Sequence, residues 1–191
     1  MVGEQNDTVQ RILRSSNWLM SVLYAARAVD LPDWFVGAGA IRNTVWDYLH
    51  GYTVPTPLAD VDVVFFDPQD LTPARDAAAE ALLDTYLPGI PWQAKNQAAV
   101  HLWYPDVFGY AVEPATSSKD AIGTWPETAT CIGVRLLPDD TLLIAAPHGL
   151  DDLLHMVLRH NPRRATVEVF RQRLQSKRIA EKWPCVQVID G

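Results

Sequence analysis

The sequence is poor in cysteine and contains no long apolar run. Its 191 residues include only two cysteines, Cys131 and Cys185, which are too few for a disulfide scaffold and are not spaced as metal ligands. No stretch approaches the roughly 20 apolar residues that cross a bilayer, and residues 1–10 lack the basic and then apolar layout of a secretory signal. We therefore expect a soluble, cytoplasmic protein that does not bind a membrane.

Several common functional signatures are also missing. The chain has no G-x-S-x-G elbow, no G-x-x-x-x-G-K-[ST] phosphate loop and no G-x-G-x-x-G dinucleotide fingerprint. Repeats, low-complexity tracts and linkers are absent as well. With 48% hydrophobic and 20% charged residues the composition is that of an ordinary globular protein, which excludes wholesale disorder. We expect a single domain over residues 1–191.

The net charge of −7 conceals a strong asymmetry. Residues 159–182 contain eight basic and two acidic side chains, so this segment carries +6 and the remainder carries −13. Residues 44–73 contain five acids and no Lys or Arg. Concentrated carboxylates favour a divalent cation, whereas a basic helix either binds phosphate or faces water.

Apolar periodicity and turn residues predict a mixed α+β fold. A basic C-terminal helix closes the chain in this reading, and its apolar stripe of Val167, Phe170 and Leu174 places the charges on the solvated side. The predicted elements are a helix at about 8–28, a strand at 33–36, a helix at 41–49, a strand at 61–66, a helix at 70–87, a strand at 91–95, a helix within 96–104, a hairpin of 128–136 and 141–146, and helices at 150–158 and about 166–182.

Two aspartates open the strand predicted at 61–66. Asp60 and Asp62 are two residues apart, and because side chains alternate along a strand, both carboxylates must point to the same side. Two neighbouring anions repel, which raises a pKa or costs stability unless a cation such as Mg²⁺ neutralises them. The alternative is that the strand begins in solvent and these are hydrated surface acids.

A glycine-containing turn precedes the pair. Gly37 and Gly39 follow a short apolar strand and lead directly into a helix, where bare backbone amides and the positive end of the helix dipole suit a phosphate. Arg42, one turn into that helix, could reach the same anion. Such glycines also serve simply to let a strand and a helix pack closely.

Two segments together, FVGAGAIRNTVWD at 35–47 and DVDVVFFD at 60–67, resemble a family of bacterial nucleotidyltransferase-like proteins in the DNA polymerase β type superfamily. The resemblance covers most of the chain from about residue 34. Its later segments are 95–101, 125–130 and 146–153. It implies an α+β fold with a nucleotidyltransferase-like mixed sheet core flanked by helices, a glycine turn that contacts nucleotide phosphates, and an Asp pair that binds divalent metal.

Carried over residue by residue, the resemblance makes Asp60 and Asp62 the catalytic and metal-binding pair for Mg²⁺, or for Mn²⁺ in its place. The expected nucleotide-binding residues are Gly37, Gly39, Ala40, Arg42 and Asn43. The family pattern has Gly or Ser at the position of Ala40, and a third carboxylate that this sequence does not place. Asn96, at the end of the strand at 91–95, together with His101 and Glu127, completes the candidate pocket.

Three hypotheses follow from these residues. The first is a Mg²⁺-dependent nucleotidyltransferase that moves a nucleoside monophosphate from an NTP to an unidentified hydroxyl acceptor and releases pyrophosphate. The second is a catalytically inactive nucleotide-binding module or partner-binding protein with the same fold. The third is a structural protein whose Asp pair is solvated.

Other patterns favour structural roles. His148, Asp152 and His155 have helical spacing that suits a transition metal, but Gly149 interrupts it and capping by Asp151 or Asp152 is the simpler reading. The tryptophans lie in core-like runs, where burial is expected before base stacking. Nucleic acid binding by the basic C-terminal segment is a minority reading, because no aromatic residues are interleaved with its charges from 171 to 182.

Overall fold

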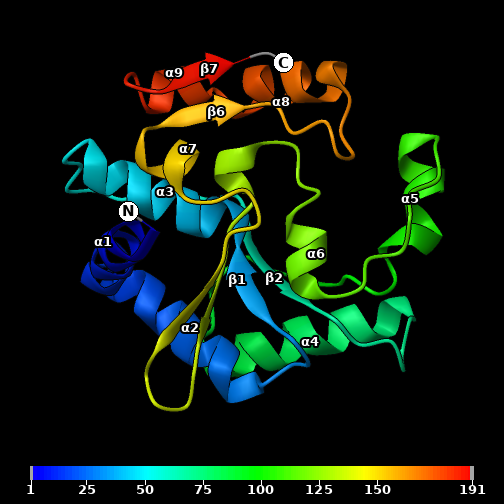
Figure 1. The fold of residues 1–191 in the computed structure, drawn as a ribbon. Coiled ribbons are helices and arrows are strands. Elements are labelled where there is room, and N and C mark those ends of the chain that lie inside the picture. Colours follow the sequence, from blue (N-terminus) through cyan, green and yellow to red (C-terminus); the bar gives the residue numbers. More distant parts are fainter. Residues whose placement is uncertain (1, 190–191) are drawn as a thin grey trace.

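A computed structural model describes residues 2–189, and its centre is a mixed five-stranded sheet (Figure 1). The strand order is β3-β2-β1-β4-β5, in which β2 and β3 are parallel and the other neighbouring pairs are antiparallel. The strands are β1 (Phe35–Gly37), β2 (Val61–Phe65), β3 (Trp92–Asn96), β4 (Gly133–Leu136) and β5 (Leu142–Ala145). The predicted α+β fold with a mixed sheet flanked by helices is confirmed.

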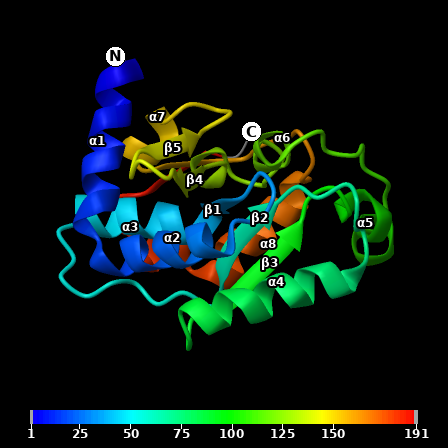
Figure 2. The same ribbon diagram turned by 90° about the horizontal axis from the view of Figure 1, so that it is seen from below.

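Helices surround this sheet, and α2 and α4 pack against one of its faces (Figure 2). The helices are α1 (Val2–Ser15), α2 (Asn17–Val29), α3 (Ala38–Leu49), α4 (Pro73–Tyr86), α5 (Val100–Phe108), α6 (Ser118–Ile122), α7 (Asp151–Leu154), α8 (Val167–Lys177) and α9 (Ile179–Lys182), with a 3₁₀ turn at Thr128–Thr130. A separate parallel pair joins β6 (Val157–Arg159) to β7 (Gln187–Ile189). Figure 1 shows α7, α8, α9 and this pair gathered at the top of the view.

The alternation of side chains along β2 decides which face of the sheet carries polar groups. Val61, Val63 and Phe65 are fully buried in the main core, where their β-branched and aromatic side chains suit a strand. Asp62 and Val64 lie between them and therefore point to the opposite face. Burial of these three side chains in the core therefore determines that the Asp62 side chain points away from the core.

The N-terminal segment forms two helices, which corrects the prediction of one helix over about 8–28. Ser16 separates them in an extended conformation, and its Oγ accepts a hydrogen bond from the Leu19 amide at 3.2 Å. A serine at this position caps the second helix, since the side chain satisfies an amide that has no intrahelical partner.

The prediction of one helix over 150–158 is wrong. Only α7 is helical in this segment; Met156 then adopts a left-handed φ of 55°, and the chain continues as the strand β6. The partner of β6 is β7 at the far end of the chain, so local periodicity does not reveal this strand. The helix predicted at about 166–182 is likewise divided, into α8 and α9, because Arg178 has a φ of 51°.

The other predicted elements are present with shifted ends. A helix is predicted within residues 96–104. In the structure β3 extends to Asn96, a turn follows, and α5 begins at Val100. The hairpin of β4 and β5 is confirmed, although its first strand begins at Gly133. Over residues 2–189, no helix combines the length and the apolar character needed to cross a membrane.

Gly37 is a point of close packing at the end of β1. A Cβ placed on it would lie 2.7 Å from the Cη2 atom of Trp125 and 2.9 Å from the backbone oxygen of Ile132. Its φ of −143° is ordinary extended backbone, so space rather than conformation calls for glycine. The close approach at Gly37 is thus to the ring of Trp125 and the backbone at Ile132, which lie in loop segments, and not between a strand and a helix as the sequence suggests.

We predict that Gly37→Ala destabilises the protein by roughly 1–3 kcal/mol, because the ring of Trp125 or the backbone at Ile132 must shift. Urea unfolding measures the change in the free energy of unfolding. Gly3→Ala is the matched control, since nothing lies within 4 Å of the added methyl group and alanine favours the helix. Equal stability of the two variants would contradict this account of Gly37.

Candidate functional site

A polar cavity of about 210 Å³ opens on the face of the sheet that carries Asp62. Four parts of the fold form its walls: the turn from β1 into α3, the start of β2 with β3 beside it, the segment at 125–130, and α8. The lining residues are Ala38, Gly39, Arg42, Asp60, Asp62, Gln93, Trp125, Pro126, Glu127, Thr130, Arg173 and Lys177. The Asp pair and the turn therefore share one cavity.

The turn between β1 and α3 exposes backbone to this cavity. Ala38 begins α3 with a left-handed φ of 49°, a conformation that costs a residue with a side chain about 1–2 kcal/mol. The Ala38 amide donates to the Ile132 oxygen at 3.1 Å, whereas the following first-turn amides have no intrahelical acceptor. These amides and the helix dipole make the start of α3 suitable for an anion.

Three of the five predicted nucleotide-binding residues, Gly37, Ala40 and Asn43, are not among the residues that line this cavity. Ala40 is 1% exposed and belongs to the main core, so its side chain does not reach the cavity. Asn43 is also buried, and its Oδ1 accepts hydrogen bonds from Nε and Nη2 of Arg42 at 3.2 and 2.9 Å. Asn43 therefore orients Arg42 instead of lining the cavity.

Arg42 is a buried cation in the cavity wall. Its guanidinium lies 5.3 Å from the ring of Trp46 and 5.4 Å from that of Trp183. Burial lowers the pKa of Arg42 to about 10, against the opposing influence of Glu127. The side chain stays charged at neutral pH, and the two bonds to Asn43 use Nε and Nη2 while Nη1 takes no part in them.

The Asp pair carries the repulsion expected from its spacing. Burial, and then the charge of Asp60, raise the pKa of Asp62 to about 6, and the cations Lys177, Arg173 and Arg42 offset this only in part. Two such carboxylates offer hard oxygen ligands, which is the donor chemistry that Mg²⁺ and Mn²⁺ prefer. The pair therefore fits a divalent cation.

Glu127 is committed to a neighbouring cation. Its Oε1 accepts from Nε of Arg173 at 2.6 Å, and its Oε2 accepts from the Thr130 hydroxyl at 2.7 Å. Burial alone would raise the pKa of Glu127, but these bonds and the charge of Arg173 outweigh it and lower the pKa. For Arg173, burial opposes the charged form, yet the bond to Glu127 raises its pKa.

The cations of α8 were missed by the sequence reading, which assigned the charges of this segment to solvent. Arg173 and Lys177 both line the cavity, and burial lowers the pKa of Lys177, with Arg173 and Arg42 adding repulsion. Their spacing could have revealed this position. Arg173 and Lys177 follow the buried Phe170 by three and seven residues, so all three lie on the same face of the helix. The stripe of α8 that faces inward is apolar at Phe170 and basic further along.

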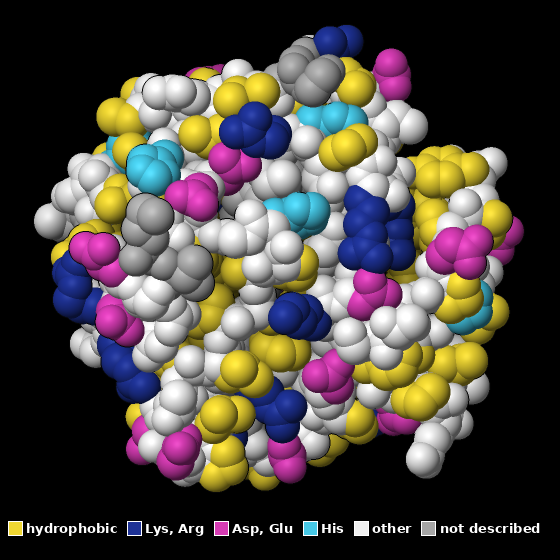
Figure 3. Space-filling model, viewed as in Figure 1, with side chains coloured by type: hydrophobic (Ala, Val, Ile, Leu, Met, Phe, Trp, Pro, Cys, Tyr) yellow, Lys and Arg dark blue, Asp and Glu magenta, His cyan; other side chains and the backbone are white. Residues whose placement is uncertain are grey.

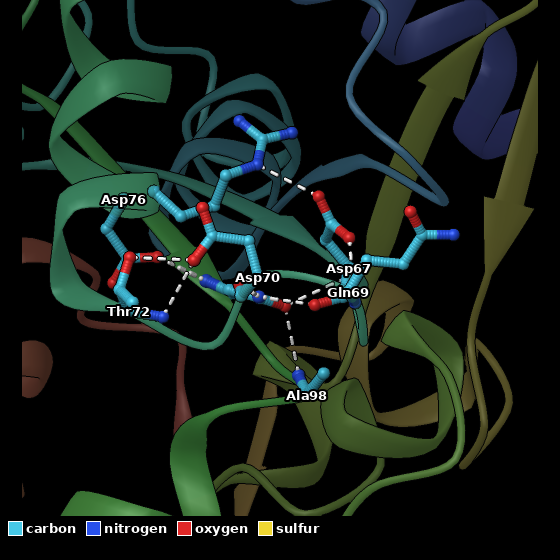
Figure 4. Close-up of polar contacts among 8 residues, drawn as sticks. Asp67, Gln69, Asp70, Thr72, Asp76 and Ala98 are labelled. Carbon is cyan, nitrogen blue, oxygen red and sulfur yellow. Dashed lines mark hydrogen bonds and ion pairs between the residues drawn. The ribbon is translucent and has the colours of Figure 1, made fainter.

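Asn96 and His101 do not line the cavity. The Asn96 amide donates from Nδ2 to the backbone oxygens of Asp67 and Asp70 at 2.7 and 2.9 Å. Its Oδ1 accepts from the amides of Asp67 and Ala98 at 2.9 and 3.1 Å. Figure 4 shows this network, in which the loop after β2 is fastened to the end of β3. His101 lies on α5 with its Nδ1 buried and without a hydrogen bond to any described residue.

Gln93 occupies the strand position beside Asp62. The two residues are partners in the parallel pairing of β2 and β3, and both line the cavity. Within residues 2–189, no three His, Cys, Asp or Glu side chains are grouped so as to hold a metal ion. The groups at this site that could hold a metal ion are thus two carboxylates, with an amide as neighbour.

The spacing of His148, Asp152 and His155 does not produce a metal site. Asp152 pairs with Arg159 at 3.0 Å and accepts from the Thr128 hydroxyl at 2.6 Å. Nε2 of His148 lies 2.9 Å from the backbone oxygen of Gly123, and Nδ1 of His155 lies 2.9 Å from that of Asp151. Neither Asp151 nor Asp152 caps α7, because its N-cap position is Leu150.

Comparisons with known proteins bear on this arrangement. A nucleotidyltransferase family model matches residues 24–188. A search of curated proteins gives no match. An NMR structure that reveals a CCA-adding enzyme head domain is similar with a TM-score of 0.80 and 30% sequence identity, over 95% of this chain and 96% of that chain.

Two larger structures share the fold at lower identity. The *Thermotoga maritima* CCA-adding enzyme complexed with tRNA has a TM-score of 0.55 and 16% identity, over 95% of this chain and 42% of that chain. A tRNA-processing enzyme in an apo form has a TM-score of 0.51 and 17% identity, over 95% of this chain and 44% of that chain. The present chain thus spans less than half of each.

We predict that Glu127→Gln destabilises the protein by roughly 1–3 kcal/mol at neutral pH, because Arg173 loses its charged acceptor. The pKa of Glu127 is lower in the folded protein than its ordinary 4.5. Its charge therefore contributes stability that is complete above about pH 4.5 and is lost as the pH falls through the folded-state pKa.

Urea unfolding of both proteins between pH 7 and pH 3 measures this effect. The difference in the free energy of unfolding between wild type and Glu127→Gln should shrink as the pH is lowered. A difference that stays constant over this range would contradict the assignment of a charged, stabilising Glu127.

Proposed function

The chain belongs to the nucleotidyltransferase family, and from this premise we propose that it is a Mg²⁺-dependent enzyme that transfers a nucleoside monophosphate from an NTP to a hydroxyl acceptor. The observation that carries the proposal is that Asp60 and Asp62 share one cavity with the turn at the start of α3 and with Arg42. The carboxylates that would bind a cation therefore lie in the same cavity as the backbone amides and the guanidinium that would bind an anion.

The proposed reaction is a displacement at the α-phosphorus of the NTP. The acceptor hydroxyl oxygen forms a bond to this phosphorus, and the bond from phosphorus to the bridging oxygen of the β-phosphate breaks. The electron pair leaves with pyrophosphate, and the hydroxyl proton passes to water. Such a reaction depends on positioning and on electrostatic stabilisation more than on covalent chemistry by the protein.

The residues divide between these tasks. Asp60 and Asp62 would hold the Mg²⁺, or Mn²⁺ in its place, which when bound neutralises triphosphate charge and orients its oxygens. The amides after Ala38 bind a phosphate, and Arg42 and Lys177 supply positive charge along the same wall. Arg173 is engaged by Glu127 and chiefly holds α8 in place.

The second candidate is a module that binds nucleotide without turning it over. It is favoured by the amide of Gln93 beside Asp62, where a third acid would complete the set used by the superfamily. Glu127 does not substitute, since Arg173 and Thr130 occupy its oxygens. Binding of Mg²⁺–NTP without pyrophosphate release over a broad screen of hydroxyl acceptors would favour this candidate.

We predict that Asp60→Asn and Asp62→Asn each lower pyrophosphate release by at least about two orders of magnitude. Each also weakens binding of Mg²⁺–NTP in calorimetric titrations with all four NTPs. Circular dichroism should show an unchanged fold, because asparagine keeps the shape of aspartate. Asp7→Asn, an exposed aspartate on α1, is the matched control and should leave both readouts unchanged. Unchanged Mg²⁺–NTP affinity in the Asp60 and Asp62 variants would overturn the proposal.

We also predict that Lys177→Gln weakens Mg²⁺–NTP binding about tenfold to a hundredfold, as expected for the loss of one charge-assisted hydrogen bond to phosphate. The same titration of Lys182→Gln is the control. Lys182 lies on α9, exposed and outside the cavity. Equal affinities of the two variants would remove Lys177 from the proposed site.

A further inference from the structure

A second cavity adjoins the first and shares part of its wall. It has a volume of about 260 Å³ and lies between β2, β3, α5 and the start of α8. The residues common to the two cavities are Asp62, Gln93, Trp125, Pro126 and Arg173. A molecule held in the second cavity would therefore have Asp62 at its boundary with the proposed triphosphate site.

Aromatic side chains line the second cavity, and two of them remain exposed to solvent. Trp103, Tyr104 and Phe108 of α5 line it on one side, and Trp125 lines it on another. The rings of Tyr104 and Phe108 are stacked with centroids 4.3 Å apart. Trp103 and Phe108 nevertheless remain 38% and 44% exposed, and Figure 3 shows hydrophobic side chains gathered over α5 at the right of the view. Exposed ring faces of this kind suit a planar ligand.

One cation in this cavity has no acidic partner among the residues that the structure describes. The guanidinium of Arg164 lies 5.3 Å from the ring of Tyr104, and burial lowers its pKa. The other two cations are paired: Nζ of Lys95 lies 3.3 Å from Asp76, and Nε of Arg173 lies 2.6 Å from Glu127. A half-buried arginine without a carboxylate favours one anionic group on a ligand.

We propose that this second cavity is the acceptor subsite and that it takes a small planar compound carrying a free hydroxyl and one phosphate or carboxylate. The inference rests on the proposed nucleotidyltransferase function. The ring lies against Trp103 and Phe108, the anionic group meets Arg164, and the hydroxyl faces Asp62. A nucleoside monophosphate has all three features.

The charge distribution favours a small acceptor over the end of a long RNA. A polynucleotide needs a row of cations along its backbone. Here Lys95, Arg163 and Arg173, which surround Arg164, are each paired with a carboxylate. One unpartnered Arg164 matches one anionic group.

The test uses the full chain with Mg²⁺ and a saturating ATP analogue in which a methylene group replaces the oxygen between the α- and β-phosphates. AMP, CMP and phenyl phosphate are then titrated, with binding followed by tryptophan fluorescence and calorimetry. An RNA hexanucleotide with a free 3′ end is titrated separately. We expect the small compounds to bind in addition to the ATP analogue.

Variants locate the binding. Arg164→Gln should weaken binding of the small phosphates about tenfold to a hundredfold. Trp103→Ala, at a position that is 38% exposed and outside the hydrophobic core, should weaken AMP and CMP binding without disturbing the fold. Arg135→Gln is the matched control, because Arg135 also lies over an aromatic ring, 5.5 Å from Trp34, but outside both cavities. It should bind AMP as the wild type does.

The outcomes separate this inference from the proposed function. Failure of the ATP analogue to bind with Mg²⁺ would overturn the proposed function itself. If the analogue binds but no small phosphate does, or if Arg164→Gln and Arg135→Gln bind AMP equally, the acceptor subsite is overturned while the proposed function stands. Tighter binding of the hexanucleotide than of AMP would replace the small acceptor with RNA.

Discussion

The site depends on the electrostatic interaction between the carboxylates at the start of β2 and the cations of α3 and α8. Asp60 and Asp62 repel each other in a partly buried setting, and Arg42, Arg173 and Lys177 surround them without forming an ion pair with either. Two of these three cations are held by other groups. Glu127 fixes Arg173, and Asn43 with two tryptophans fixes Arg42. The carboxylates are thus left free for a divalent cation, which is the condition for the proposed chemistry.

This arrangement joins the C-terminal part of the chain to α3. Trp183, beyond α9, packs edge-on against Trp46 of α3 with ring centroids 5.4 Å apart. Its Nε1 donates to Asp47 at 2.8 Å, and its ring also faces Arg42. Trp183 follows α8 and α9 in the sequence. Docking of Trp183 against α3 therefore helps hold Arg173 and Lys177 of α8 over the sheet. The basic C-terminal segment is therefore part of the cavity wall, and its charge complements the acids at the start of β2.

Local patterns in the sequence predicted what depends on local geometry. The two-residue period of a strand was enough to bring Asp60 and Asp62 to one side, and the residues Gly37 to Gly39 were enough to mark the turn into α3. What failed depends on distant partners. β6 forms because β7 lies beside it, and the inward side of α8 is known only once the sheet is in place. Asn96 has the chemistry of a metal ligand, yet three hydrogen bonds to the loop after β2 and one from the amide of Ala98 occupy its side-chain amide.

Trp125 shows how packing and binding are combined in the turn. Its ring lies where a side chain at position 37 would stand, so packing is by itself a sufficient reason for glycine at this position. The same ring lines both cavities, between the proposed triphosphate site and the aromatic wall of α5. Ala38 has a left-handed φ, and it lines the first cavity together with Gly39. The two interpretations of the glycines are therefore compatible: close packing accounts for Gly37, and the proposed phosphate binding concerns the backbone from Gly39 onward.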